Sequence, residues 1–216
     1  DVASLANTRA RADELLRTRK PFDVIIANAG VMACPFGKTS DGFEMQFGTN
    51  HLGHFVFVNR LVPLLKSGSR IINLSSAGHR FADVDLDDPN FERTDYHPFV
   101  SYGRSKTANI LFSVGLERRL GGRGIRSAAV HPGGIQTELG RHLTPELIAQ
   151  IMPAGPSSFK FKTIPQGAAT QVWSAVVASA DHVGGRYCED CHVAEVTNDP
   201  AARTGVRSYA LDPAHA

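Results

Sequence analysis

The sequence has few cysteines, little net charge and no long hydrophobic run. Three cysteines in 216 residues, an odd number, exclude a framework of disulfides and favour a reducing compartment, so we expect a cytoplasmic protein. Charged residues, glycine or proline interrupt every apolar stretch, which excludes a membrane segment. The net charge of +2 is spread over the chain, so no basic patch predicts binding to nucleic acid or to an anionic membrane. We expect one domain over residues 1–216, either a monomer or a homo-oligomer.

The hydrophobic pattern predicts helices that are separated by short apolar runs. Ser4 is a favourable N-cap, and the apolar residues after it recur at helical spacing over residues 5–18. Longer helices are expected over about 42–65 and 99–120. The first of these carries several core candidates, of which Phe55 is one.

The apolar runs between these helices are typical of strands that are buried on both faces. Three of them lie at 23–27, 71–74 and 125–130. A fourth strand is expected to begin at 185–188. Strands that alternate with long helices imply right-handed crossovers, so we predict an α/β fold with a three-layer αβα, doubly wound parallel sheet. The stretch of about 81–97 is polar and irregular. His79, just before it, and His97, at its end, are expected to be exposed to solvent.

Tyr102 and Lys106 lie four residues apart in one of the predicted helices. Side chains at this spacing project from one face, so the phenol and the ammonium can share a pocket. A free tyrosine titrates near pH ~10, but a fixed cation beside it favours the phenolate and lowers that pKa. Such a pair can exchange a proton with the oxygen of an alcohol or a carbonyl. The same spacing also occurs on exposed helices without this role, so the pair alone does not define a site.

Three of the predicted strands end in glycine or polar residues. The segment 28–30 follows the first strand, Ser75 and Ser76 follow the second, and the segment 131–137 follows the third. Parallel sheets bind ligands at the edge where the carboxyl ends of their strands meet, and glycine there lets a ligand approach the backbone. We therefore predict that these segments and the helix with Tyr102 converge on one site.

Five segments, taken in order, resemble the successive motifs of the short-chain dehydrogenase/reductase family, which has a Rossmann-like fold. The resemblance covers essentially the whole chain. It is strongest to the retinol dehydrogenase and WW-domain oxidoreductase-like branch, because of the segments 49–55 and 75–80 and a long interval between Ser76 and Tyr102. The five segments are Ala27–Gly30, Thr49–Phe55, Asn73–Ser76, Tyr102–Lys106 and His131–Thr137.

The resemblance implies an oxidoreductase that interconverts an alcohol and a carbonyl with NAD or NADP. In that case Tyr102 would be the general acid/base, and Lys106 would hold the ribose hydroxyls and lower the tyrosine pKa. Ser76 would bind the substrate oxygen and polarise it. Asn50 would fix a water molecule that relays protons to Lys106.

The resemblance also implies which residues hold the cofactor. Asp1 and Val2 would meet the adenine, Asn28, Ala29 and Gly30 would line the adenosine side, and Pro132, Gly133, Ile135 and Thr137 would bracket the nicotinamide. The family's glycine-rich phosphate loop and first βαβ unit are expected to precede Asp1, together with the residue that distinguishes NAD from NADP. Without that loop the pyrophosphate loses its helix N-terminus, so we expect the chain alone to bind cofactor poorly.

Metal binding and nucleophilic hydrolysis are weaker interpretations. Cys188 and Cys191 have the spacing of a zinc pair, but a structural zinc needs four ligands and no second pair exists. We therefore expect no metal site, and a buried or half-buried cysteine pair at a strand end. His51 and His54 are expected to be packing residues. Ser76 lacks the Gly-x-Ser-x-Gly elbow of a hydrolase.

Two other classes can share parts of this pattern. A sugar-nucleotide epimerase can have the tyrosine and lysine pair, but the turn at 28–30 and the compact length disfavour it. A non-catalytic dinucleotide-binding sensor or scaffold module is the main alternative. The combination of Asn50, Ser76, Tyr102 and Lys106 argues against it, since a sensor needs no acid/base.

Residues 137–163 combine glycines and prolines with one apolar helical piece. This composition predicts a short amphipathic helix between breakers that include Pro153 and Pro156, which suits a flap over the nicotinamide end. The alternative is a surface helix that only packs on the domain. As a flap, the helix would offer an apolar wall, so we expect a medium-sized hydrophobic alcohol or carbonyl substrate rather than a charged metabolite. The wall would consist of Leu147, Ile148, Ile151 and Met152.

Overall fold

The computed structural model describes residues 1–152, 155 and 160–216, and its centre is a five-stranded sheet. The strands lie in the order β1-β2-β3-β4-β5; the first four are parallel and β5 is antiparallel to β4. The predicted parallel sheet is confirmed, while the β4–β5 hairpin is an addition that the sequence pattern did not predict. The strands are β1 Phe22–Ala27, β2 Leu65–Leu74, β3 Arg126–His131, β4 Tyr187–Glu189 and β5 His192–Val193.

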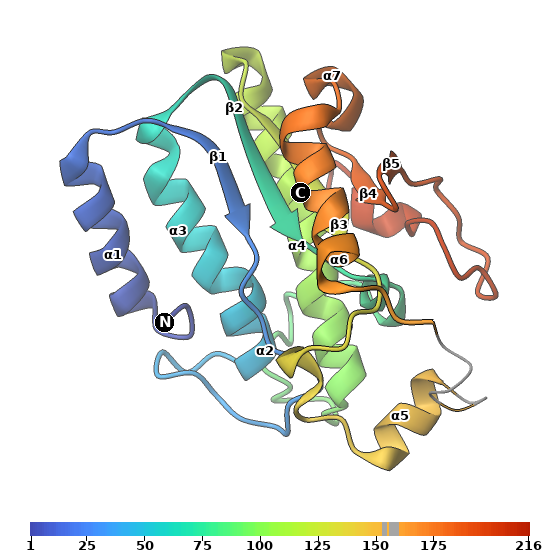
Figure 1. The fold of residues 1–216 in the computed structure, drawn as a ribbon. Helices are drawn as coiled ribbons and strands as arrows, with labels where there is room; N and C mark the ends of the chain where they lie inside the picture. The colour runs from blue at the N-terminus through green and yellow to red at the C-terminus, as the bar shows by residue number, and fades with distance from the viewer. Residues whose placement is uncertain (153–154, 156–159) are drawn as a thin grey trace.

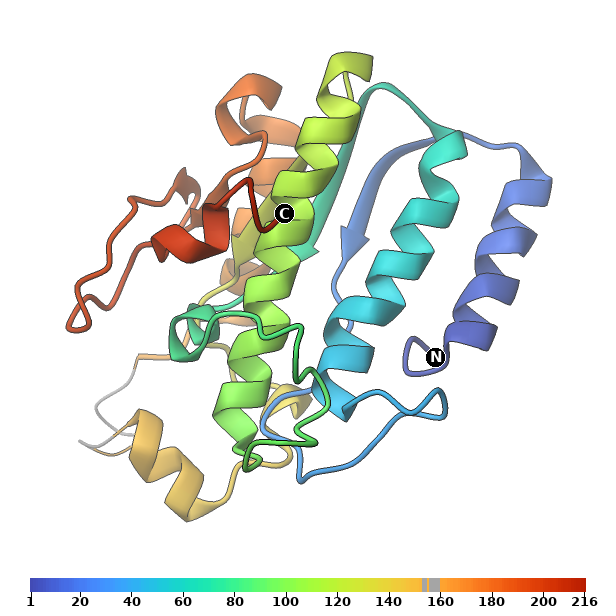
Figure 2. The same cartoon turned by 180° about the vertical axis from the view of Figure 1, so that it is seen from behind.

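Helices cover both faces of the sheet, which confirms the three-layer arrangement (Figures 1 and 2). Helices α1, α3 and α4 lie on one face, and α6 and α7 lie on the other. Successive strand residues point to opposite faces, so Ile71 packs in the first layer and Ile72 packs against Ala175 and Val183 in the second. The helices are α1 Leu5–Thr18, α2 Met45–Phe47, α3 Gly53–Leu61, α4 Pro98–Leu120, α5 Pro145–Ile151, α6 Ile164–Val172 and α7 Ala180–Val183.

Two of the predicted helices have nearly the expected ends. Helix α1 begins after Ser4, whose hydroxyl accepts a hydrogen bond from the Asn7 N–H at 3.3 Å. Helix α4 begins at Pro98, a residue suited to the first turn because its missing N–H would have no partner there. Of the helices in the described ranges, none has both the length and the apolarity that a membrane crossing requires.

The predicted helix over 42–65 is instead a series of shorter elements. Helix α2 runs into a π-helical turn, Gly48–Leu52, and then into α3 and a 3-10 turn at Val62–Leu64. A π turn contains more residues than an α turn, so it shifts the residues that face the core. The prediction that Phe55 is a core residue was wrong: its exposed fraction is 40%, and its ring lies against Phe112 at the rim of an apolar cavity.

The C-terminal residues return to pack against α4 and the end of the sheet. Val206 and Ala210 are fully buried there in one cluster with Ile110 of α4 and Tyr187 of β4. Ala210 belongs to a 3-10 turn, Ser208–Leu211. This part of the chain, 205–211, is called the C-terminal segment below.

Candidate functional site

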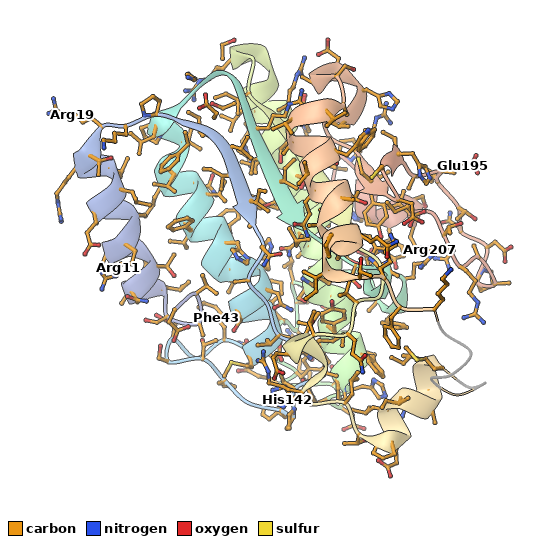
Figure 3. All side chains as sticks on the ribbon, in the orientation of Figure 1. Arg11, Arg19, Phe43, His142, Glu195 and Arg207 are labelled. Carbon is orange, nitrogen blue, oxygen red and sulfur yellow. The ribbon has the colours of Figure 1, made fainter. Side chains whose placement is uncertain are left out.

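The candidate site lies at the carboxyl edge of the sheet. Ala27 of β1 pairs with Asn73 of β2, and Leu74 pairs with Val130 of β3, so the three strands end at nearly the same level. In Figure 1 the arrows of β1 and β2 point to the end of the molecule that also holds α2, α5 and the N-terminus. Phe43 and His142 are labelled at that end in Figure 3. The segments that follow the strands therefore meet at one edge, as their order in the sequence predicted.

The side chains of Ser76, Tyr102 and Lys106 lie together at the end of β2. The Ser76 hydroxyl lies beside the Tyr102 side chain, since a Cβ on Gly78 would contact both, and the Lys106 ammonium lies 5.5 Å from the centre of the tyrosine ring. Tyr102 and Lys106 have exposed fractions of only 4% and 5%. The two side chains are therefore buried next to each other on one face of α4, as their spacing predicted.

Two glycines allow the turn after Ser76 to lie directly against α4. This 3-10 turn, Ala77–Phe81, passes under the ring of Tyr102. A Cβ atom on Gly78 would lie 2.6 Å from Tyr102 Cε1, and one on Gly103 would lie 2.9 Å from the backbone nitrogen of Ala82. Only glycine leaves room for this approach, which fixes the tyrosine ring against the turn that carries Ser76.

Burial dominates the ionisation of both groups. It raises the pKa of Tyr102 to about 12, although the Ser76 hydroxyl beside it acts in the opposite direction. It also lowers the pKa of Lys106 to about 8. Lys106 is not among the groups that shift the tyrosine pKa. Its ammonium donates to the carbonyl oxygen of Leu74 at 3.1 Å. The role of the lysine in lowering the tyrosine pKa stays a prediction.

The sequence analysis missed Asn109, which connects Lys106 to Asn50. Its side-chain amide donates to Leu74 O, the same oxygen that binds Lys106, and to the backbone oxygen of Asn50, both at 3.0 Å. The Asn50 oxygen also contacts His54 Nδ1 at 2.9 Å, and Asn109 Oδ1 contacts His51 Nδ1 at 3.1 Å. The two histidines thus pack beside Asn50, as predicted. The signal for Asn109 is its position seven residues after Tyr102, on the same face of the helix.

Asn50 is fully buried in the π-helical turn Gly48–Leu52. Its side chain holds the chain after β1, because it accepts from Val31 N–H at 2.8 Å and donates to Val31 O at 2.9 Å. It also donates to Ser105 Oγ at 3.0 Å. A Cβ on Gly30 would lie 3.0 Å from Asn50 Oδ1, so Gly30 and Asn50 are adjacent beside the lysine.

The residues expected around the cofactor line the same edge, with different exposure. Asn28 and Ala29 are exposed after β1, and Gly133 has a φ of 90° in the loop after β3, a conformation that favours glycine. Asp1 is exposed, and its carboxylate accepts from Ala3 N–H at 2.8 Å. Thr137 is exposed. The remaining four residues are half-buried: Val2, Gly30, Pro132 and Ile135.

The chemistry of Lys106 fits the ribose of a dinucleotide. An ammonium carries three donors, and the described part of the chain takes one of those of Lys106, at Leu74 O. Donors therefore remain for ribose hydroxyls. The described residues do not include a glycine-rich loop that leads from a strand into a helix, so they offer no comparable site for the pyrophosphate.

Two expectations about histidine and cysteine were wrong. His79 is not solvated: its exposed fraction is 0%. His97 is half-buried and accepts a hydrogen bond from Phe99 N–H at the start of α4. Cys188 is buried but Cys191 is exposed, because the β4–β5 turn carries it outward. Within the ranges that the structure covers, no three histidine, cysteine or acidic side chains form a cluster that could hold a metal ion.

The apolar helical piece of the segment 137–163 forms α5. Thr144 caps it by accepting from Leu147 N–H at 3.3 Å. Its apolar side chains are half-buried, and Pro153 and Pro156, the breakers expected after it, lie outside the described residues. The half-buried side chains are Leu147, Ile148, Ile151 and Met152.

Comparison with characterised sequences gives a consistent family. The pattern of the family described as Enoyl-(Acyl carrier protein) reductase matches residues 1–159. The chain is 44% identical to human retinol dehydrogenase 14 over 198 residues, which are 91% of this chain and 59% of that protein. It is 38% identical to the short-chain dehydrogenase/reductase prx1 of Penicillium roqueforti, over 99% of this chain and 64% of that protein. The chain thus spans about 60% of the length of these relatives.

Solved structures share the fold. A protein of Mycobacterium paratuberculosis is 32% identical, with a TM-score of 0.71 over 99% of this chain and 68% of that one. The NADPH-bound carbonyl reductase from chicken fatty liver is 19% identical, with a TM-score of 0.61 over 89% of this chain and 74% of that one, a likeness of fold alone. Together with the sheet order and the matched residues, these findings show that the chain belongs to the short-chain dehydrogenase/reductase family.

Proposed function

We propose that this chain carries the catalytic side chains of an NAD(P)-dependent oxidoreductase that interconverts an alcohol and a carbonyl. The observation that carries the proposal is the grouping of Ser76, Tyr102 and Lys106 at the carboxyl end of β2, with the Ser76 hydroxyl beside the tyrosine side chain and the Lys106 ammonium 5.5 Å from the centre of its ring. A relative named retinol dehydrogenase, 44% identical, supports this reaction class. A non-catalytic sensor would not need a buried phenol and hydroxyl in contact.

Tyr102 exchanges the proton. With a pKa of about 12 its phenol is protonated at neutral pH, so it donates to the carbonyl oxygen in reduction and recovers the proton in oxidation. Ser76 Oγ accepts from Gly78 N–H at 3.0 Å, which leaves the hydroxyl proton for the phenol or the substrate oxygen. A second donor at that oxygen polarises the carbonyl and stabilises the developing alkoxide.

Lys106 and Asn50 connect Tyr102 with solvent, which replaces the proton that the phenol donates in reduction and takes up the proton that it accepts in oxidation, and Lys106 orients the cofactor. Lys106 holds ribose hydroxyls with the donors that Leu74 O does not use. The carbonyl oxygens of Leu74 and Asn50 are both bound by Asn109, so Lys106 and Asn50 belong to one polar network beside Tyr102. A water fixed at Asn50 would complete this relay.

The nicotinamide cofactor, when bound, supplies or accepts the hydride. Structures of NADP complexes with the same fold support a nicotinamide cofactor, either NAD or NADP. The adenine and adenosine side would be held by Asp1, Val2, Asn28, Ala29 and Gly30, and the nicotinamide side by Pro132, Gly133, Ile135 and Thr137.

The substrate we propose is a medium-sized hydrophobic alcohol or carbonyl. The half-buried apolar side chains of α5 support this, because they lie at the same edge of the sheet as the site. The cytoplasmic location, the single domain and the oligomeric state remain predictions.

Substituting Tyr102 by Phe in the full-length protein tests the proposal. The change removes the proton but keeps most of the packing, so kcat for decanal or retinal reduction should fall by about 100- to 10,000-fold. NADH and NADPH binding, followed by fluorescence, should change by less than about threefold. Tyr96→Phe is the matched control, since its hydroxyl binds Cys34 O away from the site. A Tyr102→Phe variant with more than half the wild-type rate would rule out this mechanism.

A further inference from the structure

His79 is a buried histidine that the proposed mechanism does not use, and it lies between Ser76 and the C-terminal segment. Its Nδ1 lies 2.7 Å from Ser76 O, and its Nε2 lies 3.2 Å from the backbone nitrogen of Arg207. His79 and Arg207 are 128 residues apart in the chain. Figure 3 shows Arg207 on the side of the sheet where β4 lies.

The partners define the tautomer of this imidazole. Ser76 O can only accept, so Nδ1 must carry a proton; Arg207 N–H can only donate, so Nε2 must be unprotonated. The charged groups near the ring are Arg80 and Arg207, both cationic, and the ring of Tyr187 packs on it at 4.9 Å. Both nitrogens therefore have a backbone partner only when the ring is neutral.

The backbone carbonyl oxygen of His79 accepts two further hydrogen bonds, one from α4 and one from the C-terminal segment. Thr107 of α4 donates to it at 3.1 Å, and the Tyr209 hydroxyl of the C-terminal segment donates to it at 2.7 Å. Arg207 in turn donates to the carbonyls of Thr197 and Asp199 through its guanidinium, at 2.9 and 2.6 Å. The C-terminal segment is thus attached to the turn after Ser76 at the ring and at the carbonyl of one residue.

We propose that His79 is a positioning residue that couples the C-terminal segment to Ser76, so that this segment sets the direction of the Ser76 hydroxyl toward Tyr102. The inference rests on the proposed function, because it assigns His79 a role only through Ser76. Ser76 O accepts both the His79 ring and the His79 backbone N–H, the latter at 3.1 Å. Its hydroxyl is therefore held next to a backbone that cannot move without breaking these bonds.

Two substitutions separate the ends of this connection. His79→Asn places an amide near the position of Nδ1, so it can donate to Ser76 O but releases Arg207. His79→Gln places an amide near the position of Nε2, so it can accept from Arg207 but releases Ser76 O. Because both ends are needed, each variant should lower kcat by about ten- to a hundredfold, the effect of a misplacement of about 1 Å. Binding of NADPH should stay within threefold.

The decisive measurement is a double-mutant cycle with Ser76→Ala in the full-length protein, using decanal and NADPH. If His79 acts through Ser76, then His79→Asn should lower kcat by less than twofold when Ser76 is already alanine. Equal losses in both backgrounds would mean that His79 only stabilises the fold, and would overturn the proposal. A His79→Asn variant with the wild-type kcat would overturn the coupling to the C-terminal segment.

His97→Asn is the matched control, because it replaces a histidine that caps α4 by another good capping residue. It should retain the wild-type kcat. Tyr102→Phe separates this inference from the proposed function. If that variant stays active, the proposed function fails; if it is inactive and the cycle is additive, only the role of His79 fails.

Discussion

Replacing Lys106 by Met should inactivate the protein and make its fold more stable. Burial lowers the pKa of Lys106 from 10.5 to about 8, so at pH 7 the amine is still charged in the folded state, at a higher cost than in the unfolded chain. Each pKa unit corresponds to about 1.4 kcal/mol, so this burial costs about 3 kcal/mol. The lost hydrogen bond to Leu74 O offsets about 1 kcal/mol, and Asn109 still satisfies that oxygen. We expect a net gain of about 2 kcal/mol.

The sign of the pH dependence follows from the same shift. Between pH 8 and 10.5 the unfolded lysine binds more protons than the folded one, so the stability of the wild type rises with pH in that range. The advantage of Lys106→Met should therefore be fully present at pH 7 and disappear near pH 10.5.

Urea unfolding of the full-length protein without cofactor, at pH 7 and at pH 10, measures this difference. Lys66→Met is the control, because Lys66 is an exposed partner of Asp23 and its loss should change the free energy of unfolding by less than about 1 kcal/mol. A Lys106→Met variant that is less stable than the wild type at pH 7, with no change in the difference at pH 10, would refute the reasoning.

Two further predictions concern the surroundings of the site. Gly78→Ala places a Cβ 2.6 Å from the ring of Tyr102, so kcat should fall at least about tenfold, whereas Gly122→Ala, with no atom within 4 Å of its Cβ, should retain the wild-type rate in the same assay. Ile151→Ala and Met152→Ala in α5 should lower kcat/KM unequally for hexanal and decanal, by about tenfold or less; equal changes for both substrates, or a lower melting temperature alone, would make α5 a packing element.

Local patterns were sufficient to predict the sheet and the convergence of its loops. An apolar run such as that of β2 is buried by helices on either face, and its polar successor, Ser76, must emerge at the carboxyl edge. The four-residue spacing of Tyr102 and Lys106 was likewise enough to place both on one face of α4. These features depend on periodicity, which a sequence displays directly.

Features that depend on distant partners could not be predicted in this way. His79 lies in a polar stretch, and residues far along the chain pack on it: Tyr187 of β4 and Arg207 of the C-terminal segment, which is 128 residues later. The pKa of Tyr102 depends on how completely the surroundings exclude water, which the spacing to Lys106 does not report. Cys191 is exposed because a hairpin forms between β4 and β5, and neither strand is long enough to leave a clear alternating pattern.

The π-helical turn Gly48–Leu52 has a consequence for how this protein tolerates length changes. An α-helix advances by about 100° per residue, so removal of one residue from the turn would rotate α3 by about that angle relative to Asn50. Either Asn50 would lose Val31 and Asn109, or the stripe of Val58 and Leu61 would leave the core. The extra residue thus lets Asn50 face the site and Val58 and Leu61 face the hydrophobic core from one continuous stretch of helix, which a regular α-helix of the same length would not allow.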